Sequence, residues 1–266
     1  MKTLLLIASL LTLTVASTAA QDWALQRLNE SPRHHEWVTV EHDGRAVQAF
    51  LVYPEVEDAA LAVVVIHENR GLSDWVRSVA DQLAEAGYIA IAPDLLSGMG
   101  PDGGKTSDFP NTDAAREALY QLDPDNVTAD LRAVAEYVTA LPAANGKVAV
   151  AGFCWGGSQT FRFATNYADL NAAFVFYGRA PDSEEPLARI GTSVYGFYGG
   201  NDARVNATIP ATSERMENLK KTYDPVIYDG AGHGFMRSGE APNASEANRQ
   251  ARAAAWDRLK TLLSAL

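Results

Sequence analysis

The stretch "VAVAGFCWGGSQTF", from Val148 to Phe161, joins an apolar run to a Gly-Phe-Cys-Trp-Gly turn. Residues 147–153 have the composition of a buried strand, and the residues from Trp155 onward have the pattern of a helix. Cys154 stands where the strand gives way to the helix. It is the only cysteine among 266 residues, so it cannot form an internal disulfide.

The flanks of Cys154 match a nucleophile elbow, G-x-nucleophile-x-G, with cysteine in the place of serine. A nucleophile on such a sharp turn has a strained backbone, and side chains at Gly152 and Gly156 would collide with neighbouring elements. The amides that begin the following helix point at the sulfur, which favours a thiolate and later an oxyanion. The alternative is a buried structural cysteine between two packing glycines.

Outward from this turn, apolar strand patterns alternate with amphipathic helix patterns. This alternation predicts an α/β fold, with a mostly parallel central sheet and helices on both faces. The segment 96–112 is rich in turn residues and is expected to be the longest irregular one. The predicted strands are 37–42 and 46–54 (a hairpin), 61–68, 88–93, 147–153, 172–178, 193–199 and 225–230; the predicted helices begin after Ser73, at Asp123-Pro124, at Trp155, near 213 and near Ser245.

The first twenty residues have the three parts of a secretory signal peptide. Lys2 supplies the positive start, an apolar run follows, and small residues end at Ala20. We therefore expect cleavage near Ala20, export to the periplasm or the medium, and one domain over residues 21–266. No later stretch is long and apolar enough to predict a membrane span.

The charge balance excludes some partners. The chain carries 22 basic and 33 acidic side chains, a net charge of −11, and such a surface repels nucleic acid and anionic lipid. No cluster of residues has metal-ligand spacing, and no dinucleotide motif is complete, so we expect no metal and no cofactor. We expect a monomer that acts on a small molecule.

A thiol nucleophile needs a base, and position along the chain selects it. Ligands bind parallel sheets at the carboxyl ends of the strands. His233 follows the last strand in a glycine-rich loop, whereas His67 lies in a strand pattern and is expected to pack in the core. Asp202 follows another strand, and the order nucleophile, acid, histidine is that of α/β-hydrolases. We therefore predict a Cys154, His233 and Asp202 triad.

Five motifs resemble those of the dienelactone hydrolase family of α/β-hydrolases. They are "IHENRGL", "APDLLS", "GFCWGG", "GGND" and "GAGHGF", and together they span about residues 62–235. The resemblance implies the α/β-hydrolase fold, the same triad and a carboxylate beside the thiol, which here is Glu68. It also implies that this catalytic carboxylate meets the resting thiol and helps to generate the thiolate when substrate arrives. A nearby carboxylate disfavours the thiolate, so the resting sulfur would resist oxidation.

The oxyanion hole is expected at the backbone amides of Trp155, next to the nucleophile, and of Asn69, which follows a strand. The family holds a substrate carboxylate with two arginines. One matches Arg237, but Gly98 occupies the position of the other. Arg70, beside Glu68, is the candidate to replace the missing arginine, and both arginines could equally be surface charges.

These features predict a hydrolase that cleaves a carboxylic ester or lactone through a cysteine nucleophile. Because one arginine of the clamp is missing, an esterase for uncharged esters is an alternative. A different class is a ligand-binding protein without activity, or a thiol redox sensor, on the same scaffold. The complete triad disfavours the first, and the lack of a second cysteine disfavours an intramolecular redox cycle.

Overall fold

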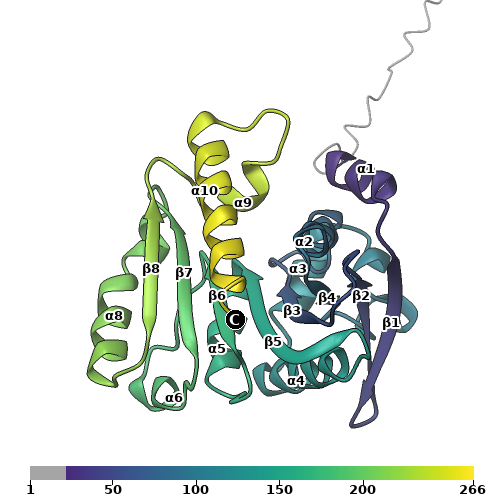
Figure 1. Ribbon diagram of the computed structural model, residues 1–266, viewed down its shortest axis with the longest axis horizontal. Helices are drawn as coiled ribbons and strands as arrows, with labels where there is room; N and C mark the ends of the chain where they lie inside the picture. Colours follow the sequence, from purple (N-terminus) through teal and green to yellow (C-terminus); the bar gives the residue numbers. More distant parts are fainter. Residues whose placement is uncertain (1–21) are drawn as a thin grey trace, which may run out of the picture.

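The computed structural model describes residues 22–266, and the predicted signal peptide lies outside them. Its centre is one eight-stranded sheet with the order β1-β2-β4-β3-β5-β6-β7-β8. Figure 1 shows β1 and β8 at opposite edges of the sheet. The strands are β1 (His35–His42), β2 (Arg45–Val52), β3 (Ala60–Ile66), β4 (Ile89–Pro93), β5 (Ala144–Phe153), β6 (Ala172–Phe176), β7 (Ser193–Gly199) and β8 (Tyr223–Tyr228).

The sheet is mostly parallel, as predicted. β1 and β2 form the antiparallel hairpin around Asp43-Gly44, and β2 also pairs antiparallel with β4. Every pair from β4 through β8 is parallel. The carboxyl ends of the parallel strands therefore lie along one edge, where the predicted chemical residues follow them.

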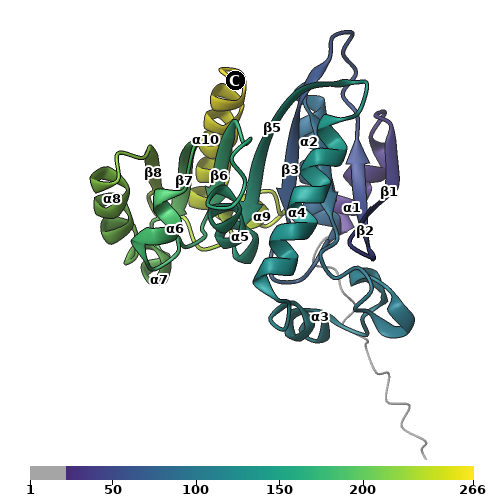
Figure 2. The same ribbon diagram turned by 90° about the horizontal axis from the view of Figure 1, so that it is seen from below.

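Helices cover both faces of the sheet, which confirms the predicted α/β architecture (Figures 1 and 2). One face packs against α1 (Asp22–Glu30), α2 (Asp74–Glu85), α9 (Phe235–Ser238) and α10 (Glu246–Leu263). The other face packs against α4 (Pro124–Thr139), α5 (Trp155–Ala164), α6 (Glu184–Ala188), α7 (Ala203–Asn206) and α8 (Ile209–Asn218).

The central strand β3 is buried along its whole length, and so are β4 and β6. Their Val, Ile, Ala and Phe side chains divide between the two apolar layers of the molecule. Burial of one large apolar side chain contributes about 1.5–3 kcal/mol, so these strands form a rigid base for the loops at their ends.

The segment 96–112 is more ordered than the sequence predicted. It contains two short turns of 3₁₀ helix, η1 (Pro101–Gly103) and η2 (Thr106–Asp108), and leads into α3 (Thr112–Leu119), which lies beside them in Figure 2. Thr106 anchors the segment, because its Oγ1 donates to Asp94 at 2.6 Å and accepts from the Leu72 amide at 3.1 Å. A short helix with few apolar positions leaves a weak sequence pattern, so α3 and α1 were not predicted.

Strand β3 ends at Ile66, two residues earlier than predicted, so His67 and Glu68 already belong to the loop at the carboxyl edge. His67 is fully buried, as expected of a core residue. Its Nε2 accepts from the Leu95 amide at 3.3 Å, and Nδ1 lies 2.8 Å from the Glu68 carbonyl oxygen. Burial lowers the pKa of His67 and keeps the ring neutral.

None of the helices within residues 22–266 has the length and apolar character to cross a bilayer.

Candidate active site

Cys154 sits at a strained turn between β5 and α5. Its φ of 56° and ψ of −113° lie where residues other than glycine are rare. Two backbone bonds hold it there: the Cys154 amide donates to the Phe176 carbonyl at 3.0 Å, and the Ser158 amide donates to the Cys154 carbonyl at 3.2 Å. The turn thus presents the half-buried thiol at the carboxyl edge of the sheet.

The two glycines of the elbow are required by close packing. A methyl group at Gly156 would overlap the carbonyl oxygens of Ile66 and His67, at the end of β3. One at Gly152 would overlap the Gly156 carbonyl and the Thr160 hydroxyl. Helix α5 therefore approaches the sheet more closely than any side chain at these positions would permit, as the motif predicted.

A Gly156→Ala variant is expected to lose about 3 kcal/mol of unfolding free energy, since rigid backbone must move to admit one methyl group. Urea unfolding followed by circular dichroism measures this loss. The control is Gly191→Ala, where the nearest atom, the Ala168 carbonyl oxygen, would lie 3.9 Å from the added carbon. Equal stability of the two variants would contradict the packing argument.

Asp202 and His233 come from neighbouring loops after β7 and β8. Asp202 caps α7, with Oδ1 accepting from the Val205 amide at 3.4 Å. Asn201 joins the two loops, because its backbone amide donates to the Ala231 carbonyl and its side-chain amide to the Gly230 carbonyl, both at 2.9 Å. These bonds set the distance between the acid and the imidazole before any ligand is present.

The structure brings the three predicted triad residues into one line of contacts. His233 Nδ1 lies 2.5 Å from Asp202 Oδ2, and His233 Nε2 lies 3.1 Å from Cys154 Sγ. The contact with Cys154 and then that with Asp202 outweigh partial burial and raise the pKa of His233 to about 9. At neutral pH the imidazole is therefore protonated, and a positive ring beside the sulfur stabilises a thiolate.

The two backbone amides expected to bind an oxyanion come from Trp155, the residue after Cys154, and from Asn69 in the loop after β3. Trp155 is the first residue of α5, whose leading amides have no partner within the helix. The Asn69 amide donates to no acceptor among the described residues. The Trp155 indole stacks on His67 with the ring centroids 5.6 Å apart, which fixes the loop that carries Asn69 against the start of α5.

Glu68 lies at this edge but pairs with Arg237 rather than with the thiol. Arg237 Nε donates to Glu68 Oε2 at 2.7 Å, and the Glu68 side chain is only 8% exposed. The polar contact that the structure gives the sulfur comes from His233. Two residues that the sequence assigned separately, one to the thiol and one to the substrate, therefore neutralise each other.

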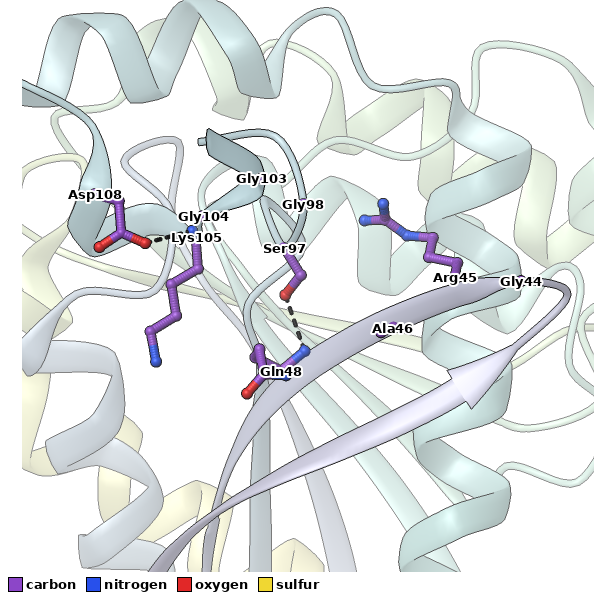
Figure 3. Close-up of a pocket in the computed structure, with 10 residues that line it drawn as sticks. All are labelled: Gly44, Arg45, Ala46, Gln48, Ser97, Gly98, Gly103, Gly104, Lys105 and Asp108. Carbon is purple, nitrogen blue, oxygen red and sulfur yellow. Dashed lines mark hydrogen bonds between the residues drawn. The ribbon is translucent and has the colours of Figure 1, made fainter. Parts of the chain in front are cut away.

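The other two positions discussed for the arginine clamp lie apart from Cys154. Arg70 is exposed and does not line the pocket around the sulfur. Gly98 lines a different hollow of about 610 Å³ between β2 and the segment after β4, where Figure 3 shows it with Arg45 and Lys105 on either side of Ser97. This hollow shares no lining residue with the pocket at Cys154.

The pocket at Cys154 has a volume of about 180 Å³. It includes residues that sequence reasoning did not select, above all Arg179 and Arg204. Both follow strand ends, β6 and β7, so the rule that singled out Asp202 could have found them. The lining residues are Tyr120, Cys154, Trp155, Ser158, Tyr177, Arg179, Arg204, Val205 and His233.

Tyr177 forms one wall of the pocket in an unusual state. Its φ of 41° is in the left-handed region, its side chain is buried, and its hydroxyl has no hydrogen-bond partner among residues 22–266. Its ring meets the His233 ring edge to face at 5.0 Å. Burial raises the pKa of Tyr177 well above its usual range, so the side chain stays an uncharged phenol beside the imidazole.

Among residues 22–266, no group of three or more His, Cys, Asp or Glu side chains is placed to bind a metal ion.

The family model and a curated relative indicate the same family. The model of the dienelactone hydrolase family matches residues 47–266. A curated protein of Saccharolobus solfataricus, named "Putative carboxymethylenebutenolidase", is 29% identical over 254 residues, which cover 83% of this chain and 95% of that protein.

Two solved structures with dienelactone hydrolase in their descriptions match along nearly their whole length. A dienelactone hydrolase-like promiscuous phosphotriesterase from metagenomic libraries has a TM-score of 0.74 and 25% identity, over 88% of this chain and 98% of that chain. A dienelactone hydrolase from Anabaena variabilis has a TM-score of 0.62 and 20% identity, over 84% and 96%.

Proposed function

This chain belongs to the dienelactone hydrolase family, and from that premise we propose that it hydrolyses a carboxylic ester or lactone with Cys154 as the nucleophile. The observation that carries the proposal is the line of contacts from Asp202 through His233 to the sulfur, at 2.5 and 3.1 Å. A cysteine that only packs in the core does not require contact with an imidazole that is itself bound to a buried acid, whereas a nucleophile does.

In the first half of the proposed reaction, the Cys154 thiolate attacks the carbonyl carbon. The negative charge that forms on the carbonyl oxygen is held by the backbone amides of Asn69 and Trp155. The tetrahedral intermediate then expels the alkoxide, which takes the proton from His233 Nε2. The acyl group remains on the sulfur as a thioester.

In the second half, His233 is neutral and accepts a proton from a water molecule. The hydroxide attacks the thioester carbonyl, the same amides hold the oxyanion, and the sulfur leaves. Asp202 keeps Nδ1 protonated throughout, so that Nε2 faces the reacting atoms. The products are a carboxylic acid and the regenerated Cys154, and no cofactor takes part.

The resemblance implies that Glu68 helps to form the Cys154 thiolate, and we include this role in the proposal under one condition. Since Glu68 is held by Arg237 at 2.7 Å, it can act on the thiol only when that ion pair opens. We also propose that the protein is exported. This proposal rests on the signal-peptide pattern of the first twenty residues, which lie outside the described residues.

The proposal is tested by the pH dependence of two reactions of the same thiol. With the pKa of His233 raised to about 9, His233 is the protonated acid below that pH and loses its proton as the pH rises through it. We therefore expect kcat/KM for an alkyl ester or lactone to fall above about pH 9. Alkylation of Cys154 by iodoacetamide needs no acid, so we do not expect its rate to fall above this pH.

Mass mapping completes this test, because Cys154 is the only thiol in the chain. Labelling of Cys154 should remove ester turnover in proportion to the fraction labelled. Ester turnover that survives complete labelling would refute the proposal.

A further inference from the structure

The pocket around Cys154 is lined by two arginines and by no carboxylate. Arg179 follows β6, where its backbone amide donates to the Ser158 hydroxyl at 2.9 Å. Arg204 lies on α7, two residues after Asp202. The acid nearest to Arg204 in the chain, Asp202, is 7% exposed and already bound to His233. The acid nearest to Arg179, Asp182, does not line the pocket.

Neither guanidinium has a hydrogen-bond or ion-pair partner in the described part of the chain. Most arginines of the described residues donate to carboxylates or carbonyl oxygens, as Arg237 does to Glu68. Arg179 and Arg204 are exposed and donate from their side chains to no acceptor among residues 22–266. Their hydrogen-bonding capacity is therefore available to a ligand in the pocket.

The charge of these arginines runs against the charge of the whole protein. The chain has a net charge of −11, so its long-range field repels an anionic ligand. Two guanidinium groups without a carboxylate partner and the imidazolium of His233 place positive charge in the lining of this pocket. A narrow pocket with low-dielectric walls concentrates such a local field.

We infer that Arg179 and Arg204 determine substrate specificity by holding a carboxylate of the ester or lactone. This rests on the proposed function, and it puts anion recognition beside β6 and β7, away from the predicted clamp. Of the two clamp positions, Arg237 is paired with Glu68, and Gly98 lies in the other hollow. Guanidinium groups suit this task because their planar fork matches the geometry of a carboxylate.

The size of the pocket restricts the substrate further. Its volume of about 180 Å³ is below the roughly 300–1,000 Å³ of sites that enclose drug-sized ligands. We therefore expect the part of the ester or lactone that the pocket encloses to be short, with its carboxylate within a few bonds of the carbonyl that Cys154 attacks.

The test compares two alkylating reagents that differ in charge, iodoacetate and iodoacetamide. In both reactions the Cys154 thiolate displaces iodide and forms a thioether, so every labelled chain reports on this pocket. We measure the ratio of the iodoacetate rate to the iodoacetamide rate by mass spectrometry of the intact protein. The double variant Arg179→Gln, Arg204→Gln is expected to lower this ratio by about tenfold, as charge-assisted bonds at partly exposed sites predict.

The matched control is Arg27→Gln on α1, an exposed arginine that also donates to no acceptor in the described chain but lies outside this pocket. It should leave the ratio unchanged. An unchanged ratio in the double variant, or an equal fall in the control, would overturn the inference. Circular dichroism verifies that each variant is folded, and its iodoacetamide rate verifies that the thiol is reactive.

This readout is independent of ester turnover, so the two proposals can fail separately. For the wild-type enzyme we also expect a higher kcat/KM on a short monoester of a dicarboxylic acid than on its neutral methyl ester. In the double variant this preference should disappear through a rise in KM for the acidic ester. Turnover of both esters through Cys154 with no preference would leave the proposed function standing and remove the inference.

Discussion

Replacing Cys154 with alanine is expected to lower kcat/KM for esters by about 10⁴-fold, because no other group at the site can form the acyl intermediate. The His233 ring and the two amides proposed for the oxyanion hole remain, so a small residual rate above that of water is expected. The measurement is ester hydrolysis under conditions where the substrate concentration is below KM. The stability of the variant, followed by circular dichroism, should stay close to that of the wild type.

Cys154→Ser is the matched control for this change, since it preserves a nucleophile of similar shape. The serine hydroxyl has a far higher pKa than a thiol, so the ion pair with His233 is lost. We expect activity between those of the wild type and the alanine variant. If Cys154→Ala hydrolysed esters at the wild-type rate, the thiol would have another role, and a redox sensor or a ligand-binding protein would become the better explanation.

Asp202→Asn is expected to reduce kcat by about 10³- to 10⁴-fold while leaving the fold intact. The Asp202 carboxylate accepts from His233 Nδ1 at 2.5 Å. An asparagine amide can donate to that nitrogen instead, which favours the tautomer with the proton on Nε2 and removes the base needed for deacylation. The asparagine oxygen can still accept from the Val205 amide, so the cap of α7 is retained.

Two measurements identify the cause of this loss. The pKa of His233, followed by NMR of the ring, should fall in Asp202→Asn, because a charge that favours the imidazolium is gone. Asp229→Asn makes the same chemical change in the exposed loop after β8, outside the pocket, and should keep full activity. Equal rates for the two variants would show that Asp202 only caps a helix.

The sequence left two enzyme alternatives, a hydrolase for an acidic ester or lactone and an esterase for uncharged esters, and they differ in the charge of the substrate. An esterase for uncharged esters would follow from the missing arginine at Gly98, but Arg179 and Arg204 supply positive charge to the pocket from other elements. The comparison of acidic and neutral substrates therefore tests particular side chains.

Much of the fold could be predicted because its signals are local. The buried run before Cys154 and the glycines at 152 and 156 specify a strand, a tight turn and a helix within about fifteen residues of sequence. The alternation of strands and helices then gives a parallel sheet, and its carboxyl edge collects Asp202 and His233 with Cys154. The order of the motifs along the chain was therefore sufficient to predict that these three residues meet at one edge of the sheet.

What only the tertiary structure decided is how the charged side chains pair. Glu68 and Arg237 are 169 positions apart, and nothing in either local sequence indicates that they neutralise each other. Arg179 and Arg204 likewise acquire a meaning only when two loops close around the same sulfur. Periodicity and glycine placement act through the nearby backbone and can be read along the chain. The pairing of long charged side chains depends on distances and burial that exist only once the sheet has formed.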